Sequence, residues 1–172
     1  ATTEIYTLSL PDALPIFWTT TPWTLPANLA VAYNSKFDYQ LIRVGDEALL
    51  VSVQLIDTVV EKCGWAGDFE ILRTVQGDQM AGLEYHHPFC NRTGKLFAGD
   101  TFVDDSAGTG LVHVAPGHGQ DDYNLGRANG LPIYSPVDDT GCLTRTADLP
   151  EEQQMPDELV GKQILEIGRA HV

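Results

Sequence analysis

Two segments of the chain hold the side chains best suited to chemistry. The first, Trp18–Asn28, reads WTTTPWTLPAN and carries four threonine hydroxyls, each able to donate and to accept a hydrogen bond. Its two prolines fix φ and remove two amide donors, so we expect a rigid, irregular strand. An ordinary edge strand whose threonines face water fits the same composition. Composition alone therefore leaves open whether these hydroxyls meet solvent or a ligand.

The second segment, Gly108–Tyr123, reads GTGLVHVAPGHGQDDY. An apolar strand carries His113 into a Pro-Gly-His-Gly loop that holds His118, and Asp121 and Asp122 then begin a helix. Capping explains either aspartate, because the helix dipole favours carboxylates at its N-terminus. An ionised aspartate that projects into a pocket can instead bind an ammonium group through a charge-assisted hydrogen bond. For the histidines, a hydrogen-bonded structural role is the alternative to a role in a site.

A metal site built from these histidines and aspartates is disfavoured. The gap between the histidines spans a strand and a turn, and no HExxH pattern or cysteine pair supports ligation. Cys63, Cys90 and Cys142 are scattered and odd in number, which predicts neither a disulfide framework nor a zinc knuckle. There is no Gly-x-Ser-x-Gly elbow, and the glycines at 108–110 do not form a phosphate-binding motif. We therefore expect neither a metal nor a cofactor.

The elements that position these segments are predicted to be mostly strands. Asp38–Val44 and Glu47–Ser52 flank Gly45-Asp46, a strong hairpin signal. Glu70–Val75 reads as a further strand, and Asp138–Gly141 as a turn. We also expect a strand pair formed by two runs around a glycine-rich loop, Thr101–Val103 and Leu111–Ala115.

Two short helices complete the prediction. Ser52 is placed to cap the first, and Gly64 to end it in the left-handed conformation. Between them, apolar residues recur at helical spacing: Leu55, Ile56, Val59, Val60 and Cys63. The second helix is expected over Asp121–Asn129, stopping at Gly130. The fold class that follows is mostly β with short helices (α+β).

Length and charge limit the kinds of partner. A chain of 172 residues suits one compact domain, and no apolar run approaches the roughly 18 residues needed to span a bilayer. No secretory signal is evident, so we expect a cytoplasmic protein with no membrane partner. The net charge of −14 repels a nucleic-acid backbone at long range, so only a short piece of a nucleic acid is expected to enter a site here.

The two ends differ in character from the middle of the chain. Residues 6–16 and 166–172 resemble conceptual translations of sequencing-adapter DNA. We therefore expect the domain to occupy residues 17–165, with residues 1–16 and 166–172 as foreign tails; a native strand and a native helix are the alternative.

Taken together, TTTPWTLPAN and GTGLVHVAPGHGQDDY resemble the editing domain inserted into bacterial-type isoleucyl-tRNA synthetases, in order and in separation. The related valyl and leucyl domains usually have arginine before the first proline and Pro-Ala-His in the second motif. Thr21 before Pro22 and the sequence Pro116-Gly-His118 instead favour the isoleucyl member. The resemblance covers about residues 17 to 165 and implies the β-barrel-like editing domain of class I synthetases.

The resemblance also implies roles for individual residues. Asp122 matches the carboxylate that holds the α-ammonium of the misattached amino acid. Thr19, Thr20 and Thr21 match the tract that contacts the terminal adenosine and the ester and positions water. His113 matches the wall of the amino-acid pocket that helps to exclude isoleucine. Supporting, substrate-binding roles fall on the remaining motif positions, Thr24, Asn28, His118 and Asp121.

The implied reaction is hydrolysis of valyl-tRNA(Ile), with the 3′ end of tRNA(Ile) carrying valine and the remainder of the synthetase as partners. The ester is already activated, so orientation and a positioned water can supply much of the acceleration without a covalent nucleophile. Isoleucyl enzymes are the known example of double-sieve editing, in which a second, tighter site removes the smaller product. The chain lacks the His-Ile-Gly-His and Lys-Met-Ser-Lys-Ser signatures of amino-acid activation. A module that binds the aminoacyl end without hydrolysis, and a metal-dependent hydrolase, are the alternatives.

Overall fold

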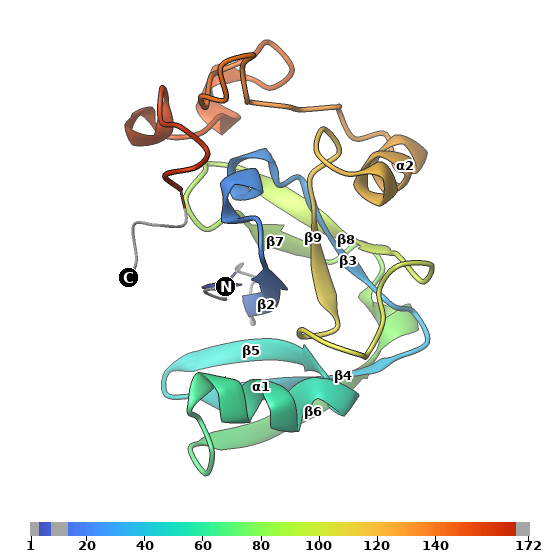
Figure 1. Ribbon diagram of the computed structural model, residues 1–172. Coiled ribbons are helices and arrows are strands. Elements are labelled where there is room, and N and C mark those ends of the chain that lie inside the picture. The colour runs from blue at the N-terminus through green and yellow to red at the C-terminus, as the bar shows by residue number, and fades with distance from the viewer. Residues whose placement is uncertain (1–3, 8–13, 168–172) are drawn as a thin grey trace.

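Two open sheets form the framework of the protein (Figure 1). The computed structural model describes residues 4–7 and 14–167. The first sheet has the strand order β1 (Glu4–Thr7), β2 (Leu14–Thr19), β5 (Glu47–Ser52), β4 (Asp38–Val44) and β6 (Phe69–Gln76). The second has the order β7 (Glu84–His86), β8 (Thr93–Ala98), β3 (Ala30–Tyr33) and β9 (Leu111–Val114). The predicted mostly-β class with short helices is confirmed, although the two sheets do not close into a barrel.

The predicted hairpin is confirmed at the predicted bounds. Val44 pairs with Glu47, so Gly45-Asp46 forms a two-residue turn in which Gly45 has a φ of 58°. The alternation of apolar residues in these strands places one face of the hairpin against helix α1 (Ile56–Cys63), as Figure 1 shows. Their shared core contains Ile16, Ile42, Leu49, Val51, Ile56, Val59 and Val60.

Helix α1 ends as predicted but begins differently. Gly64 takes the left-handed conformation, with φ 71°, and its amide donates to the Glu61 carbonyl oxygen. Ser52 does not cap α1, because a 3₁₀ turn, η2 (Val53–Leu55), intervenes. The Ser52 hydroxyl instead donates to Gln54 Oε1 at 3.0 Å. The prediction of Ser52 as the helix cap was therefore wrong.

The second sheet corrects one predicted strand pair. Residues 101–103 form a tight turn, in which the amides of Phe102 and Val103 both donate to the Gly99 carbonyl oxygen, at 3.0 and 2.9 Å. Because these two amides bond locally, they are not available to pair with a partner strand. Strand β9 pairs instead with β3, antiparallel, and β3 also pairs with β8, parallel. All four residues of β3 are buried, so this strand lacks the alternation that marks a half-exposed strand.

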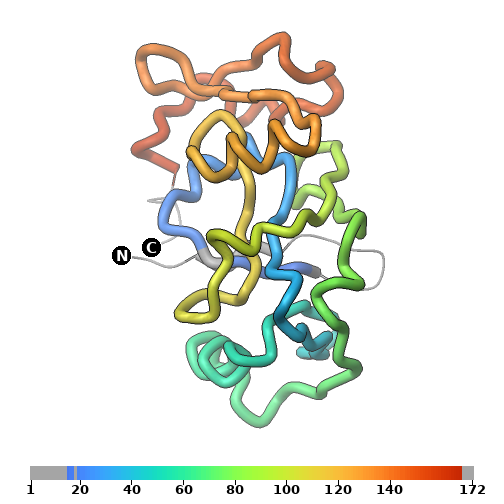
Figure 2. Tube along the Cα trace, turned by 90° about the vertical axis from the view of Figure 1, so that its right-hand side faces the viewer, coloured from blue at the N-terminus to red at the C-terminus, as the bar shows by residue number. Residues whose placement is uncertain are grey.

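The chain after β9 covers the end of the second sheet. Helix α2 (Gln120–Ala128) ends near Gly130, which has a φ of 72°, one residue from the predicted bounds at each end. The segment after α2 contains the 3₁₀ turns η4 (Glu151–Gln153) and η5 (Asp157–Leu159), and residues 131–160 lie at the far end of the molecule from α1 (Figure 2). Its turn at Asp138–Gly141 is confirmed by a 2.9 Å bond from the Gly141 amide to the Asp138 carbonyl oxygen.

Residues near the expected domain boundaries take part in packing. Ile16 is fully buried, and Ile167 packs beside Cys90, Leu143 and Met155. The assignment of residues 1–16 and 166–172 as foreign tails stays a prediction, and residues 1–3, 8–13 and 168–172 lie outside the described part. Within residues 4–7 and 14–167, no helix is long and apolar enough to cross a membrane.

Candidate functional site

The threonine-rich segment is a 3₁₀ helix where an irregular strand was expected. Strand β2 ends at Thr19, and η1 (Pro22–Ala27) follows. Pro22 occupies the first turn, where no intrahelical amide donor is needed and a fixed φ suits the helix. The Thr21 carbonyl oxygen accepts bonds from both the amide and the hydroxyl of Thr24, at 3.1 and 2.8 Å. These local bonds explain why the predicted strand was wrong.

The three consecutive threonines divide into one buried and two exposed side chains. Thr19 is buried, and its Oγ1 accepts a 3.0 Å bond from the Thr21 amide. The hydroxyls of Thr19 and Thr21 lie 3.3 Å apart, so the buried residue orients the exposed one. Thr20 and Thr21 are open to solvent. Their hydroxyls are therefore accessible to a ligand.

A hydrogen bond joins the two sequence segments. Thr24 Oγ1 lies 3.1 Å from His113 Nε2, and the Phe17 ring stacks on the His113 imidazole, with centroids 5.3 Å apart and planes at 27°. The Thr24 hydroxyl proton is directed to the Thr21 carbonyl oxygen, so its oxygen must accept from Nε2–H. Burial, and then the charge of His118, lowers the pKa of His113 to about 4. His113 is thus a neutral imidazole protonated on Nε2 at neutral pH, and its Nδ1 is an acceptor.

His118 also contacts the threonine segment, through Trp23. Its ring meets the edge of Trp23, with centroids 5.2 Å apart and planes at 88°, and its amide donates to the Ala115 carbonyl oxygen. Burial lowers the pKa of His118. Within the described residues, His113 Nδ1 and His118 Nε2 are buried without a hydrogen-bond partner. Such unmet atoms are uncommon in folded proteins and suit a ligand's polar groups.

The two aspartates at the start of α2 differ in environment. Asp121 is exposed, whereas Asp122 is half-buried and accepts a 3.0 Å bond from the Ala115 amide through Oδ2. Burial raises the pKa of Asp122, the bond from Ala115 lowers it, and the Asp121 charge raises it further. A Cβ at Gly119 would lie 3.1 Å from the Asp122 carboxyl carbon, so glycine lets this carboxylate fold back against the loop. The geometry singles out Asp122 as the carboxylate held in a defined position.

Asn28 occupies a different place from the exposed threonines. Its side chain is 1% exposed, donates to the Ala30 carbonyl oxygen at 2.8 Å and accepts a 2.6 Å bond from the Tyr85 hydroxyl. The structure thus joins Thr19, Thr21, Thr24 and His113 through hydrogen bonds and brings His118 to the same segment through Trp23, but it places the Asn28 amide in the interior.

Residues that sequence reasoning did not place in the site also contact the threonine segment. His87 and Arg92 are both buried and donate to carbonyl oxygens of η1 and its C-terminal cap. No sequence signal identifies them, because backbone carbonyl groups occur at every position and reveal nothing of their partners.

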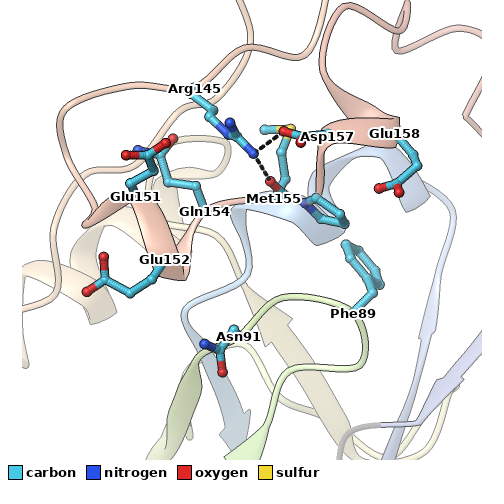
Figure 3. Close-up of a pocket in the computed structure, with 10 residues that line it drawn as sticks. Phe89, Asn91, Arg145, Glu151, Glu152, Gln154, Met155, Asp157 and Glu158 are labelled. Carbon is cyan, nitrogen blue, oxygen red and sulfur yellow. Dashed lines mark hydrogen bonds and ion pairs between the residues drawn. The ribbon is translucent and has the colours of Figure 1, made fainter.

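A hollow of about 370 Å³ lies beside η4 and η5, and Phe89 and Asn91, from the loop that carries His87 and Arg92, also line it (Figure 3). Its lining includes the carboxylates of Glu151, Glu152, Asp157 and Glu158, and Arg145 pairs with Asp157. The excess of negative charge disfavours a phosphate-bearing ligand there. In residues 4–7 and 14–167, no three histidine, cysteine, aspartate or glutamate side chains are grouped to hold a metal ion.

Sequence comparison finds isoleucine–tRNA ligases. The chain is 44% identical over 145 residues to the ligase of Lactobacillus helveticus and 46% identical over 132 residues to that of Persephonella marina. These alignments cover 84% and 77% of the chain but only 15% and 14% of the ligases, so the chain spans a small part of their length. No family model matches.

Structure comparison finds editing domains of leucyl-tRNA synthetases. The P. knowlesi cytosolic domain matches with a TM-score of 0.54 at 13% identity, covering 70% of this chain and 53% of that one. The P. falciparum cytosolic domain matches with a TM-score of 0.53 at 17% identity, covering 69% and 49%. At these identities the likeness concerns the fold alone.

Proposed function

The chain belongs to the family of isoleucyl-tRNA synthetase editing domains, and from that premise we propose that it hydrolyses valyl-tRNA(Ile). The observation that carries the proposal is the 3.1 Å contact between Thr24 and His113. It joins the hydroxyl-rich segment to the strand that leads into the Asp122 loop, so a binding wall, donors and an anchor come from adjacent elements. The reaction adds water to the valyl ester, breaks the bond from the carbonyl carbon to the ribose oxygen, and releases valine.

Asp122 anchors the substrate in this proposal. Its half-buried carboxylate binds the α-ammonium of valine through a charge-assisted hydrogen bond, while the Ala115 amide fixes one carboxylate oxygen. An amide and an ammonium then share the same carboxylate, which orients the amino acid relative to the ester.

The exposed hydroxyls of Thr20 and Thr21 act at the ester end. They hold the terminal adenosine and the attacking water, and they donate to the oxygen that becomes negative as water adds. Thr19 keeps Thr21 in place through the bond to its amide. Since the ester is already activated, this arrangement requires no covalent nucleophile, and the neighbouring ribose hydroxyl is available to assist proton transfer.

His113 supplies the selectivity. Phe17 stacks on one face of its ring and Thr24 holds its Nε2, so the imidazole cannot swing away to admit a larger side chain. Valine fits against this wall, and the additional methylene of isoleucine does not. The pocket is thus the finer of two sieves.

The acidic character of the chain fits a division of labour with the remainder of the synthetase. A net charge of −14 cannot hold a tRNA backbone, so the rest of the synthetase binds the tRNA and only its 3′ end enters this site. Amino-acid activation also belongs to the segments of the ligase that this chain does not span.

Release of labelled valine from valyl-tRNA(Ile) distinguishes hydrolysis from binding alone. The full 172-residue chain in excess over substrate, with EDTA present, should convert the ester to free valine faster than buffer does. Retention of the intact ester on the protein without release would indicate a binding module instead. Hydrolysis that EDTA abolishes would indicate a metal-dependent hydrolase.

A further inference from the structure

The last carbonyl groups of the 3₁₀ helix η1 lie in the protein interior. Leu25, Pro26 and Asn28 are all buried, and the last carbonyls of a helix are not all paired within it. The Asn28 amide donates to the Leu25 carbonyl oxygen at 2.9 Å, which leaves the second lone pair of that oxygen, and the Pro26 and Asn28 carbonyl oxygens, for other donors. Buried carbonyl oxygens require donors from elsewhere. In this protein those donors are side chains of β7 and the loop that follows it.

His87 supplies one donor in a fixed tautomer. Its Nδ1 accepts bonds from the amides of Cys90 and Phe89, at 3.0 and 3.3 Å, so the ring proton resides on Nε2. Nε2 lies 2.9 Å from the Leu25 carbonyl oxygen and donates to it. Burial, and then the nearby Arg92 charge, lowers the pKa of His87 to about 3. His87 therefore remains a neutral donor throughout the physiological range.

Arg92 supplies the other donors. Its Nε donates to the Asn28 carbonyl oxygen at 3.1 Å, its Nη2 to that of Pro26, and its Nη1 to that of Gln153 at 2.8 Å. The side chain is 8% exposed, and within the described residues it forms no ion pair with a carboxylate. A buried cation without a counter-ion is costly, whereas an apolar side chain of similar length would avoid that cost.

Tyr85 completes the same set of contacts. Its hydroxyl donates to Asn28 Oδ1 at 2.6 Å, and its ring lies against Gly94, where a Cβ would approach the hydroxyl oxygen to 2.3 Å. Strand pairing of β7 with β8, and of β8 with β3, carries these side chains to η1. Tyr85, His87 and Arg92 thus form a carbonyl clamp that binds the C-terminal end of one short helix, at Leu25, Pro26 and the cap residue Asn28.

We propose that the carbonyl clamp positions Thr24 against His113 and thereby sets the selectivity of the site; the inference rests on the proposed function. Thr24 precedes the clamped carbonyls directly in η1, and its bond to His113 is 3.1 Å long. A small shift of η1 breaks that bond, frees the His113 ring and opens the wall. Tyr85, His87 and Arg92 do not touch the reacting atoms. Arg92 also contacts Gln153 and the Tyr134 ring, but its effect on Thr24 runs through its bonds to Pro26 and Asn28.

The test compares Arg92→Met with Arg145→Met in the full chain. Arg145 also bonds a backbone carbonyl, that of Met155, and pairs with Asp157 (Figure 3). Among the described residues, no hydrogen bond or ion pair joins Arg145 to η1. The quantity measured is the ratio of the deacylation rates for valyl-tRNA(Ile) and isoleucyl-tRNA(Ile). Loss of folded protein lowers both rates equally and leaves the ratio unchanged, so the ratio separates positioning from stability. We expect Arg92→Met to slow valine release up to about 100-fold. It should lower the ratio of the valyl-tRNA(Ile) rate to the isoleucyl-tRNA(Ile) rate about tenfold.

Conservative substitution provides a check on folding. Arg92→Lys keeps a cation and a long stem, so its ratio of deacylation rates should lie between those of Arg92→Met and wild type. If Arg92→Met does not fold, Arg92→Lys is compared with Arg145→Met instead. Arg145→Met should retain the wild-type ratio. A wild-type ratio in both Arg92 variants would overturn the proposal.

A second measurement needs no activity. Imidazole ¹⁵N spectra should show His113 in a single tautomer, protonated on Nε2, in the wild-type chain and in Arg145→Met, and exchange between tautomers in Arg92→Met. A fixed tautomer in Arg92→Met would refute the clamp. Absence of hydrolysis by the wild-type chain would instead count against the proposed function, while the spectra would still decide whether the clamp holds His113.

Discussion

Replacing Asp122 with asparagine removes the proposed anchor charge while preserving the shape of the side chain. Asparagine can still accept the bond from the Ala115 amide through its carbonyl oxygen, so the loop should stay in place. A hydrogen bond to a charged group contributes about 1.5–3 kcal/mol net. Because each 1.4 kcal/mol or so changes a rate tenfold, kcat/KM for valyl-tRNA(Ile) should fall between about tenfold and about 140-fold. Asp122→Ala, which also leaves the Ala115 amide unpaired, should nearly abolish hydrolysis.

Asp121→Asn is the matched comparison, since Asp121 is the adjacent aspartate and is exposed. The assay is single-turnover release of valine at several protein concentrations, which separates binding from chemistry. Asp121→Asn should lose much less activity than Asp122→Asn, because the motif gives Asp121 only a supporting role. A wild-type rate for Asp122→Asn, or an equal loss in both variants, would refute the assignment of Asp122 as the anchor.

Asp122→Asn, which should lower activity, should raise the free energy of unfolding. Burial is the largest influence on the pKa of Asp122 and raises it, so the folded protein binds this proton more tightly than the unfolded chain. The free energy of unfolding therefore falls as pH rises through the range in which the Asp122 carboxyl loses its proton. At neutral pH the ionised carboxylate costs stability. Asp122→Asn should unfold at a higher denaturant concentration than wild type at pH 7. Lower stability would show that the carboxylate stabilises the fold instead of serving the substrate.

The remaining predictions concern selectivity, pH and tRNA binding. His113→Ala should admit isoleucine and raise hydrolysis of isoleucyl-tRNA(Ile) relative to valyl-tRNA(Ile); unchanged rejection would place the sieve on other residues. The pKa values of His87 and His113 are lowered to about 3 and about 4 from 6.5, so the unfolded chain binds more protons below pH 6.5. Stability should thus be lost as pH falls from 6.5 toward 4, by up to about 1.4 kcal/mol per pH unit for each histidine, and His87→Gln should flatten the profile measured by chemical denaturation. The chain alone should bind intact tRNA weakly because of its net charge of −14, and tight binding in a filter assay at physiological salt would contradict this.

Local sequence signals predicted the elements whose cause is local. The Asp38–Val44 and Glu47–Ser52 strands alternate around a Gly-Asp turn and were predicted at their observed bounds. The helix before Gly64 has regular apolar spacing, so its existence and its end were predicted, but not the 3₁₀ turn that precedes it. Pro22–Ala27 was mistaken for a strand because prolines disfavour regular helices in general, whereas the first turn of a helix accepts them. Thr101–Val103 has strand-like composition, but bonds to Gly99 close it into a turn.

The site was predictable in part for a similar reason. His113 and the threonine segment stood out because hydroxyls and an imidazole are conspicuous in an apolar context, and the fold brings Thr24 and His113 into contact. The roles of the site residues stay predictions. The interior position of Asn28, and the contacts of Tyr85 and Arg92 with it, arise from pairings 57 and 64 residues apart along the chain. Such pairings depend on sheet topology, which no local pattern encodes.

The most direct test of proofreading is deacylation of valyl-tRNA(Ile) beside isoleucyl-tRNA(Ile), with the chain at high concentration and EDTA present. Selective loss of valine is the predicted result and would establish a metal-free editing esterase. Equal loss of both amino acids would contradict the sieve at His113. Stable retention of both esters, by this chain and by a full-length synthetase that contains the same segment, would contradict the proposed function itself.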